Sequence, residues 1–382
     1  QNATLPTGGQ INFGNQVVTF NIKNSLTVGS GYTFTNAGSS VLNFNGTTNE
    51  SVDFGGATWP GAVTVNNAAG ITLNSDWTIA GNLTITAGTL TVPSGKTLTV
   101  GGTLLTVGGG AGAAGLTIAP GATLKFTNAG TPSLSVGNNG TLTLVGDANQ
   151  NAVVTTDTVG HLYTISVSGN ASTTISANYY TLSHLGASGL TIGTTAQATI
   201  NGANYLQNGN FSYPVANNAT FLTLNQKIPG NTLTGMTFDS GGSAATGTMS
   251  VLATASVAAP LATLTINSYT GDRTGLSYST NVTNYTVSWG TATNTLKLTQ
   301  QVSTTPATLS RGSTVTMGEW GFQETTANGT ATDLTSIKVT MTGTGTAGDV
   351  TAARIYQDTA CDGTVGSQLG SQQTLSGSPA TA

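Results

Sequence analysis

Pairs of apolar residues separated by one polar residue recur along residues 63–107, and Gly, Asn, Ser or Pro divides each pair from the next. The pairs are Val63/Val65, Ile71/Leu73, Trp77/Ile79, Leu83/Ile85, Leu90/Val92, Leu98/Val100 and Leu105/Val107. Because successive side chains of a strand point to opposite faces, each pair predicts a short strand with one buried face. The pairs begin six to eight residues apart, closer than the roughly 8–12-residue spacing typical of a sandwich. This spacing predicts a β-solenoid, in which each strand pairs with the one a full turn earlier.

The same rhythm extends in both directions along the chain. It predicts a solenoid over residues 10–290, with a dozen or so turns, three strands per turn and about 20–24 residues in each turn. Gly and Asn mark the corners, because tight corners need the positive φ angles that Gly adopts freely and Asn tolerates. Residues 1–9, which are polar and contain Pro6, are expected to form an extended N-terminal arm.

Three stretches carry a family resemblance. Residues 41–46 read VLNFNG, and residues 65–74 and 81–90 read VNNAAGITLN and GNLTITAGTL. These motifs resemble the degenerate repeats of large bacterial cell-surface proteins that fold as right-handed β-helices. The resemblance implies a right-handed parallel β-helix and an extracellular or cell-surface location, and it implies no particular activity.

A different pattern follows the solenoid. Residues 291–306 are polar and Thr-rich and are expected to be a linker. Longer strands are predicted within 307–382, at 307–311, 314–322, 334–341 and 350–356, which is the layout of an immunoglobulin-like β-sandwich. The runs 332–345 and 349–358 resemble Ig-like modules of bacterial surface proteins. About 75 residues follow Pro306, whereas such a sandwich needs roughly 100, so the domain is expected to lack its last strands.

Either the native polypeptide continues past Ala382, or a strand from another molecule fills the sheet edge that the incomplete sandwich exposes. The candidate donor is the N-terminal arm, with the assembly residues Gln1, Asn2, Ala3, Thr4, Leu5 and Pro6. A head-to-tail contact of this kind does not close on itself, so it predicts a filament of identical copies. The alternative is that residues 1–9 are simply a frayed terminus.

Composition narrows the range of partners. Only 6% of the residues are charged and the net charge is −4, so there is no basic surface for nucleic acid. No run approaches the roughly 18 apolar residues of a membrane span. Cys361 is the single cysteine and excludes an internal disulfide. No cofactor is expected.

Catalytic and metal-binding residues are sparse. The acidic residues of the solenoid region are scattered and unpaired, namely Glu50, Asp53, Asp76, Asp147, Asp157, Asp239 and Asp272. His161 and His184 are given no carboxylate partner by the sequence. The Ig-like resemblance implies a calcium-binding loop, of which only Asp358 and Asp362 remain as weak candidates, since calcium takes six to eight oxygen ligands.

These observations predict a non-catalytic extracellular structural protein, the subunit of a filament that assembles head to tail with copies of itself. One alternative is a fragment of a larger cell-surface adhesin that binds carbohydrate or a surface through exposed aromatics. Its candidates are Trp59, Trp77, Trp289, Trp320, Tyr179 and Tyr180. A second alternative is a polysaccharide-degrading β-helix enzyme, since stacking of turns can gather residues that are distant in sequence.

Overall fold

The computed structural model describes residues 2–14, 16–35, 38–158, 160–193, 198–214, 217–254, 261–280 and 284–290 in full, and the backbone of residues 296–302, 319–324, 352–356 and 368–374. The chain divides into two compact units. The first comprises residues 1–293 with 326–328, and the second comprises the rest of 294–382.

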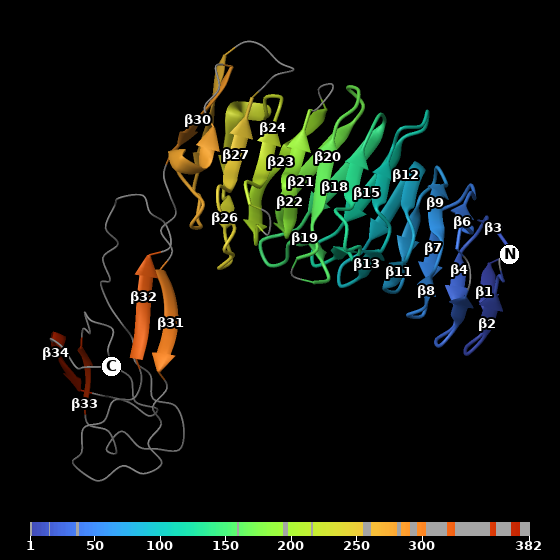
Figure 1. The fold of residues 1–382 in the computed structure, drawn as a ribbon, viewed down its shortest axis with the longest axis horizontal. Coiled ribbons are helices and arrows are strands. Elements are labelled where there is room, and N and C mark those ends of the chain that lie inside the picture. Colours follow the sequence, from blue (N-terminus) through green and yellow to red (C-terminus); the bar gives the residue numbers. More distant parts are fainter. Residues whose placement is uncertain are drawn as a thin grey trace, which may run out of the picture. The chain divides into compact units, whose positions relative to one another are not determined.

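The first unit is a coil of short strands in which every pairing is parallel (Figure 1). Three strands make one turn, so the strands form three faces. Face 1 consists of β1 (Ala3–Leu5), β4 (Leu26–Val28), β7 (Glu50–Asp53), β10 (Ile71–Leu73), the second half of β12 (Leu83–Val92), β15 (Ala114–Ile118), β18 (Gly140–Val145), and the first halves of β21 (Thr174–Ser183) and β23 (Thr199–Ser212). A further parallel ladder follows it, made of β25 (Thr232–Thr234), β28 (Ala262–Asn267) and β30 (Tyr285–Trp289).

Face 2 consists of β2 (Gln10–Asn12) paired with β5 (Thr33–Thr35), and then β8 (Thr58–Trp59), β11 (Trp77–Ile79), β13 (Thr97–Val100), β16 (Thr123–Phe126), β19 (Ala152–Thr156), the second halves of β21 and β23, and β26 (Thr237–Asp239). Face 3 consists of β3 (Thr19–Ile22), β6 (Val41–Phe44), β9 (Ala62–Asn66), the first half of β12, β14 (Leu104–Val107), β17 (Ser133–Val136), β20 (Tyr163–Val167), β22 (Leu185–Ile192), β24 (Thr220–Leu224), β27 (Met249–Ala253) and β29 (Ser279–Thr280). Two short 3-10 helices, η1 (Pro229–Asn231) and η2 (Leu276–Tyr278), lie at late corners.

The register keeps like residues above one another. Leu90 pairs with Leu116, and Leu116 pairs with Leu142, and all three side chains are fully buried. The outward neighbours Thr91, Thr117 and Thr143 form a second column. The topology therefore agrees with the parallel β-solenoid that the sequence predicts. Its right-handedness stays a prediction, which rests on the resemblance to right-handed β-helix repeats.

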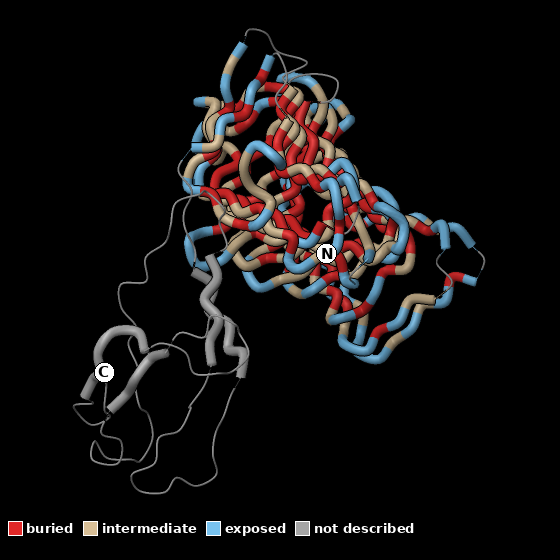
Figure 2. Tube along the Cα trace, turned by 60° about the vertical axis from the view of Figure 1, so that its left-hand side comes forward, coloured by how far each residue is buried: buried red, intermediate tan, exposed pale blue. Residues whose placement is uncertain are grey.

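The interior of the solenoid is almost entirely apolar, and buried residues line the inside of successive turns (Figure 2). In the early turns it is filled by aromatic rings. Trp77 stacks on Phe54 with ring centroids 5.0 Å apart and meets Phe44 edge to face. Because burying a large side chain contributes about 1.5–3 kcal/mol, these columns are the main source of the unit's stability.

Turn length differs from the expected 20–24 residues in the later turns. Val63 pairs with Leu83, which gives a turn of 20 residues, but Leu134 pairs with Ile165, which gives 31. Strands and corners both grow, since β18 and β19 have six and five residues where β10 and β11 have three each, and the corner between β18 and β19 takes residues 146–151. Corner length is not constrained by the apolar pattern, so the sequence could not fix it.

The N-terminal segment also differs from its prediction as a separate arm. Ala3, Thr4 and Leu5 form β1 and pair in parallel with Leu26, Thr27 and Val28 of β4. Ala3 and Leu5 are half-buried and pack on the core, while Thr4 is exposed. The first turn of the solenoid therefore begins at residue 3 rather than at residue 10, because the alternation of Ala3 and Leu5 matches that of the next turn.

In the second unit, β31 (Leu296–Val302) pairs antiparallel with β32 (Glu319–Glu324), and β33 (Ala352–Tyr356) pairs antiparallel with β34 (Gln368–Thr374). Strand β31 occupies residues that were expected to be linker, and β33 coincides with the strand expected at 350–356. The Ig-like sandwich stays a prediction, and the calcium candidates Asp358 and Asp362 lie outside the described residues.

Candidate functional site

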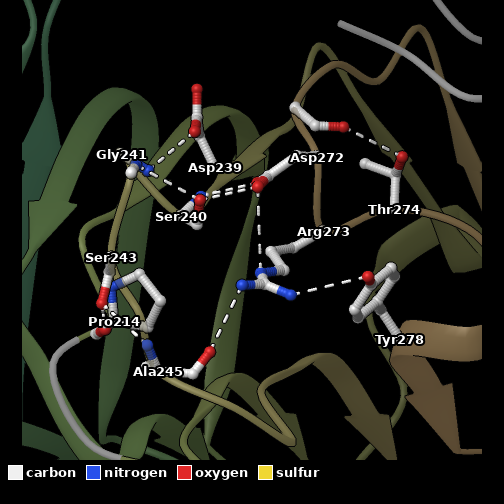
Figure 3. A network of polar contacts seen from close by, with 12 residues as sticks. Pro214, Asp239, Ser240, Gly241, Ser243, Ala245, Asp272, Arg273, Thr274 and Tyr278 are labelled. Atoms are coloured by element: carbon white, nitrogen blue, oxygen red, sulfur yellow. Dashed lines mark hydrogen bonds and ion pairs between the residues drawn. The ribbon is translucent and has the colours of Figure 1, made fainter.

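The densest polar network of the solenoid lies at a corner of its last turns (Figure 3). The backbone N–H of Ser240 donates to Oδ1 of Asp272 at 2.7 Å, and the Ser240 hydroxyl donates to Oδ2 at 2.6 Å. Asp239 accepts a hydrogen bond from the N–H of Gly241 at 2.8 Å. Both carboxylates are therefore engaged by donors of the corner itself.

Arg273 joins three segments of the same corner. Its guanidinium donates to the Ala245 carbonyl at 3.3 Å and to the Tyr278 hydroxyl at 3.5 Å, and it lies 5.5 Å from the centre of the Tyr278 ring. Its Nε lies 4.0 Å from Oδ2 of Asp272. The hydroxyl of Ser250 donates to the Arg273 carbonyl. Arg273 therefore holds segments of successive turns together.

The network joins two corners through one carboxylate. Asp272 accepts hydrogen bonds from both the hydroxyl and the backbone N–H of Ser240. Neither His161 nor His184 is among its partners. The arrangement is that of a corner lock, in which stacking has gathered Asp239 and Asp272 from different turns.

His161 has a carboxylate partner that the sequence analysis did not assign. Its Nδ1 lies 2.7 Å from Oδ1 of Asp157, four residues earlier, and both side chains are partly exposed. Desolvation acts to raise the pKa of Asp157, but the hydrogen bond and the positive charge of His161 outweigh it and hold that pKa below its ordinary value. The spacing of four residues was the signal that could have found this pair.

His184 and Tyr213 stack on neighbouring turns with ring centroids 5.3 Å apart and an interplanar angle of 10°. Both residues have positive φ, 63° and 54°. Gly241 of the next turn packs against the Tyr213 ring, and a Cβ there would overlap it. Tyr213 is 46% exposed but is held between its two neighbours, so its ring is not free to stack on a sugar. Burial lowers the pKa of His184.

The other aromatic candidates are mostly interior. Trp59, Trp77 and Tyr180 are buried in the core. Trp289 is half-buried and donates its indole N–H to Ser279 Oγ at 3.0 Å. Tyr179 is half-buried, and the side chain of Trp320 lies outside the described residues. These residues do not build an exposed aromatic platform within the described part of the chain.

A shallow hollow of about 270 Å³ lies where face 1 meets the preceding corner. It is lined by Ala68, Gly88, Thr89, Ala113, Ala114, Gly115, Thr117, Thr141 and Thr143. None of these side chains titrates, so the hollow offers hydroxyl and methyl groups and no acid or base.

The first described turn pairs on one side only. Within the described residues, β1, β2 and β3 each pair with a single strand, namely β4, β5 and β6. Their inward side chains Ala3, Leu5, Ile11 and Phe20 are only partly buried, whereas the equivalent positions of the inner turns are fully buried. Of the predicted assembly residues, Asn2, Thr4 and Pro6 are exposed at this end, and Gln1 lies outside the described residues.

Sequence reasoning grouped Glu50 with the scattered acids, but the structure gives it a distinct position. It lies in β7 opposite Ile71 and is fully buried, and neither carboxylate oxygen has a hydrogen-bond partner in the described residues. Burial raises its pKa above the ordinary value, and the neighbouring Asn67 amide acts in the opposite direction. The sequence signal for this position was the alternation of Glu50 and Val52, which places the Glu50 carboxyl group on the same inward face as Val52.

No group of three or more His, Cys, Asp or Glu is placed to hold a metal ion within the described residues. The described part of the chain also holds no helix long and apolar enough to cross a membrane. Comparisons with family models, with curated proteins and with solved structures gave no match to this chain.

Proposed function

We propose that this chain is a non-catalytic structural protein of an extracellular surface, the subunit of a filament that grows head to tail. The observation that carries the proposal is the first described turn, where three strands pair on one side only within the described residues, beside partly buried apolar side chains. Exposed edges of this kind are templates for a further strand. The sparse charge and the resemblance of residues 41–46 and 65–90 to surface β-helix repeats support the extracellular location.

The unpaired groups of this edge can be assigned residue by residue. The N–H of Ala3 donates to the Ser25 carbonyl, and the Leu5 carbonyl accepts from the N–H of Gly29. Because alternate residues of a parallel strand point to opposite sides, the N–H of Thr4 points away from β4. The carbonyl oxygens of Gly9 and Val18 accept hydrogen bonds from the second turn. By the same rule, the N–H groups of Gln10 and Thr19 point to the free side, where no described strand is paired.

Natural sheets usually protect such edges with Lys, Pro or a bulge. Strands β1 (ATL) and β3 (TFNI) carry none of these within their bounds. We therefore propose that the edge is occupied in the assembled state, by the last turn of another copy. Such a contact joins two different surfaces, so it need not close on itself and can build a filament. Because β1 already pairs with β4, donation of the whole arm to another molecule would first require this pairing to break.

Proline at the free-side positions provides the test. The triple variant Thr4→Pro, Gln10→Pro, Thr19→Pro removes three outward N–H donors and leaves the pairing with the second turn intact. The matched control is Thr4→Ser, Gln10→Asn, Thr19→Ser, which changes the same side chains and keeps every donor. Sedimentation velocity and electron microscopy measure the assembly.

We expect long polymers from the unsubstituted chain and from the control, and single molecules from the proline variant with an unchanged circular-dichroism spectrum. Polymers of equal length from the proline variant would rule out the N-terminal edge as the contact. An unsubstituted chain that stays monomeric over a wide concentration range would overturn the filament itself.

A further inference from the structure

Glu50 occupies a position that elsewhere belongs to the apolar core. Its partner in the next turn is Ile71, which pairs in turn with Leu90, and both are fully buried. An ionised carboxylate is costly in such a place unless it is paired or hydrogen-bonded. Glu50 is fully buried, and both of its oxygens lack a partner in the described residues.

One polar group that faces the Glu50 carboxyl group is another acceptor, the Lys23 carbonyl oxygen. A Cβ on Gly46 would overlap Oε1 of Glu50 and lie 2.6 Å from the Lys23 carbonyl oxygen, so these two oxygens face the same small volume. Lys23 belongs to the corner between β3 and β4, one turn before β7. On the other side, the buried Asn67 uses its amide to donate to the Thr48 carbonyl at 2.8 Å.

The charged groups around Glu50 are few. Among the described residues of β3, β4, β6, β7, β10 and the corners between them, the only other acidic or basic side chains are Lys23, which is exposed, and Asp53, which points to the outer face of β7. Two facing acceptors without a cation need a proton between them.

We propose that Glu50 is a proton-controlled latch of the N-terminal turns. While its carboxyl group is neutral, the O–H donates to the Lys23 carbonyl and holds the corner before β4 against β7. When the proton leaves to solvent, two acceptors face each other without a donor and the first two turns loosen. For the filament, which rests on the function proposed above, this latch would make assembly weaker as the pH rises.

The direction of the effect follows from linkage. The pKa of Glu50 is raised in the folded chain, chiefly by desolvation. A raised carboxyl pKa gives stability that is complete below the unfolded-state pKa and is lost as the pH rises through the folded-state pKa. The opening equilibrium of the first turns should change by up to about tenfold per pH unit within that window.

The test compares the unsubstituted chain with Glu50→Gln and Asp53→Asn. The glutamine amide mimics the neutral acid and donates at every pH, and Asp53→Asn removes a carboxylate from the outer face of the same strand. Amide exchange of Ala3–Leu5 and Leu26–Val28 is read at matched pH from 4 to 8, as a ratio between variants so that intrinsic rates cancel.

We expect the protection ratio of Glu50→Gln to the unsubstituted chain to rise severalfold with pH, and the ratio for Asp53→Asn to stay flat. A flat ratio for Glu50→Gln, or an equal rise for Asp53→Asn, would overturn the latch. Sedimentation of the same samples separates the two proposals. A pH-dependent ratio in a chain that forms no polymer supports the latch and refutes the filament. A flat ratio in a chain that forms polymer refutes the latch and supports the filament.

Discussion

Ser240 gives both its backbone N–H and its hydroxyl hydrogen to the carboxylate of Asp272, one turn later in the solenoid. The two residues are 32 positions apart in sequence, and the bond pins two corners that lie above one another. With Arg273 reaching Ala245 and Tyr278, this pair locks the last turns.

Asp272→Ala should therefore destabilise the solenoid, because two charge-assisted hydrogen bonds are lost. We expect a loss of about 1–3 kcal/mol, toward the lower end because the carboxylate is half-exposed. Ser240→Ala removes only the hydroxyl and should cost less. Urea unfolding followed by circular dichroism measures both, and equal stabilities of Asp272→Ala and the unsubstituted chain would show that the lock has no energetic role.

Gly241→Ala should be destabilising for two reasons. The residue has φ +58°, and an added Cβ would overlap the Tyr213 ring. We expect a loss of about 1–3 kcal/mol. The double variant with Tyr213→Ala should recover the steric part and leave the backbone cost. Thermal unfolding of the two single variants and the double variant completes a double-mutant cycle. If the stability losses of the two single variants simply add in the double variant, the steric account is contradicted.

Leu116→Ala should create a cavity in the middle of a buried column and cost about 2–5 kcal/mol. Its neighbour Thr117 faces outward, so Thr117→Ala is the matched control and should change stability by about 0.5 kcal/mol or less. Chemical denaturation measures the difference. Equal effects would show that the register of β15 is wrong by one residue.

The Asp157–His161 pair should stabilise the folded chain above the pH at which the Asp157 carboxylate takes up a proton. The pKa of Asp157 is lowered in the folded chain, so its contribution is complete above the unfolded-state pKa and is lost as the pH falls through the folded-state pKa. Asp157→Asn should unfold with a shallower dependence on pH below about 4. Acid titrations followed by tryptophan fluorescence measure this, and identical acid profiles would exclude a role for the pair.

The solenoid was predictable because its stability depends on a local signal. Val63, Val65, Ile71 and Leu73 alternate with polar residues, and a period of two specifies which side chains face inward. The same signal is present in Ala3 and Leu5, but Ala is a weak marker of an inward position. The sequence therefore predicts an arm where the structure has β1. The corner lengths of the later turns carry no such periodicity.

The polar sites were less predictable, because they depend on which corners lie above one another. Asp239 and Asp272 are 33 positions apart, and nothing in the sequence sets the register that makes Ser240 their common neighbour. Glu50 was visible as an acid but not as an interior residue, since the single polar position in an apolar column is recognised only once Ile71 and Leu90 are aligned with it.

The lengthening of turns from 20 to 31 residues, while the ladders keep their register, separates two kinds of position along the chain. Residues within the ladders are coupled to the turns before and after, so a change there acts on three turns at once. In the corner of residues 146–151, Gly146 and Asn151 hydrogen-bond to neighbouring turns, whereas Asp147, Asn149 and Gln150 hydrogen-bond among themselves at its tip. Insertions, tags and binding peptides placed at such corners would lie on the outside of the solenoid, one turn apart, and the stacked strands would keep their spacing regular.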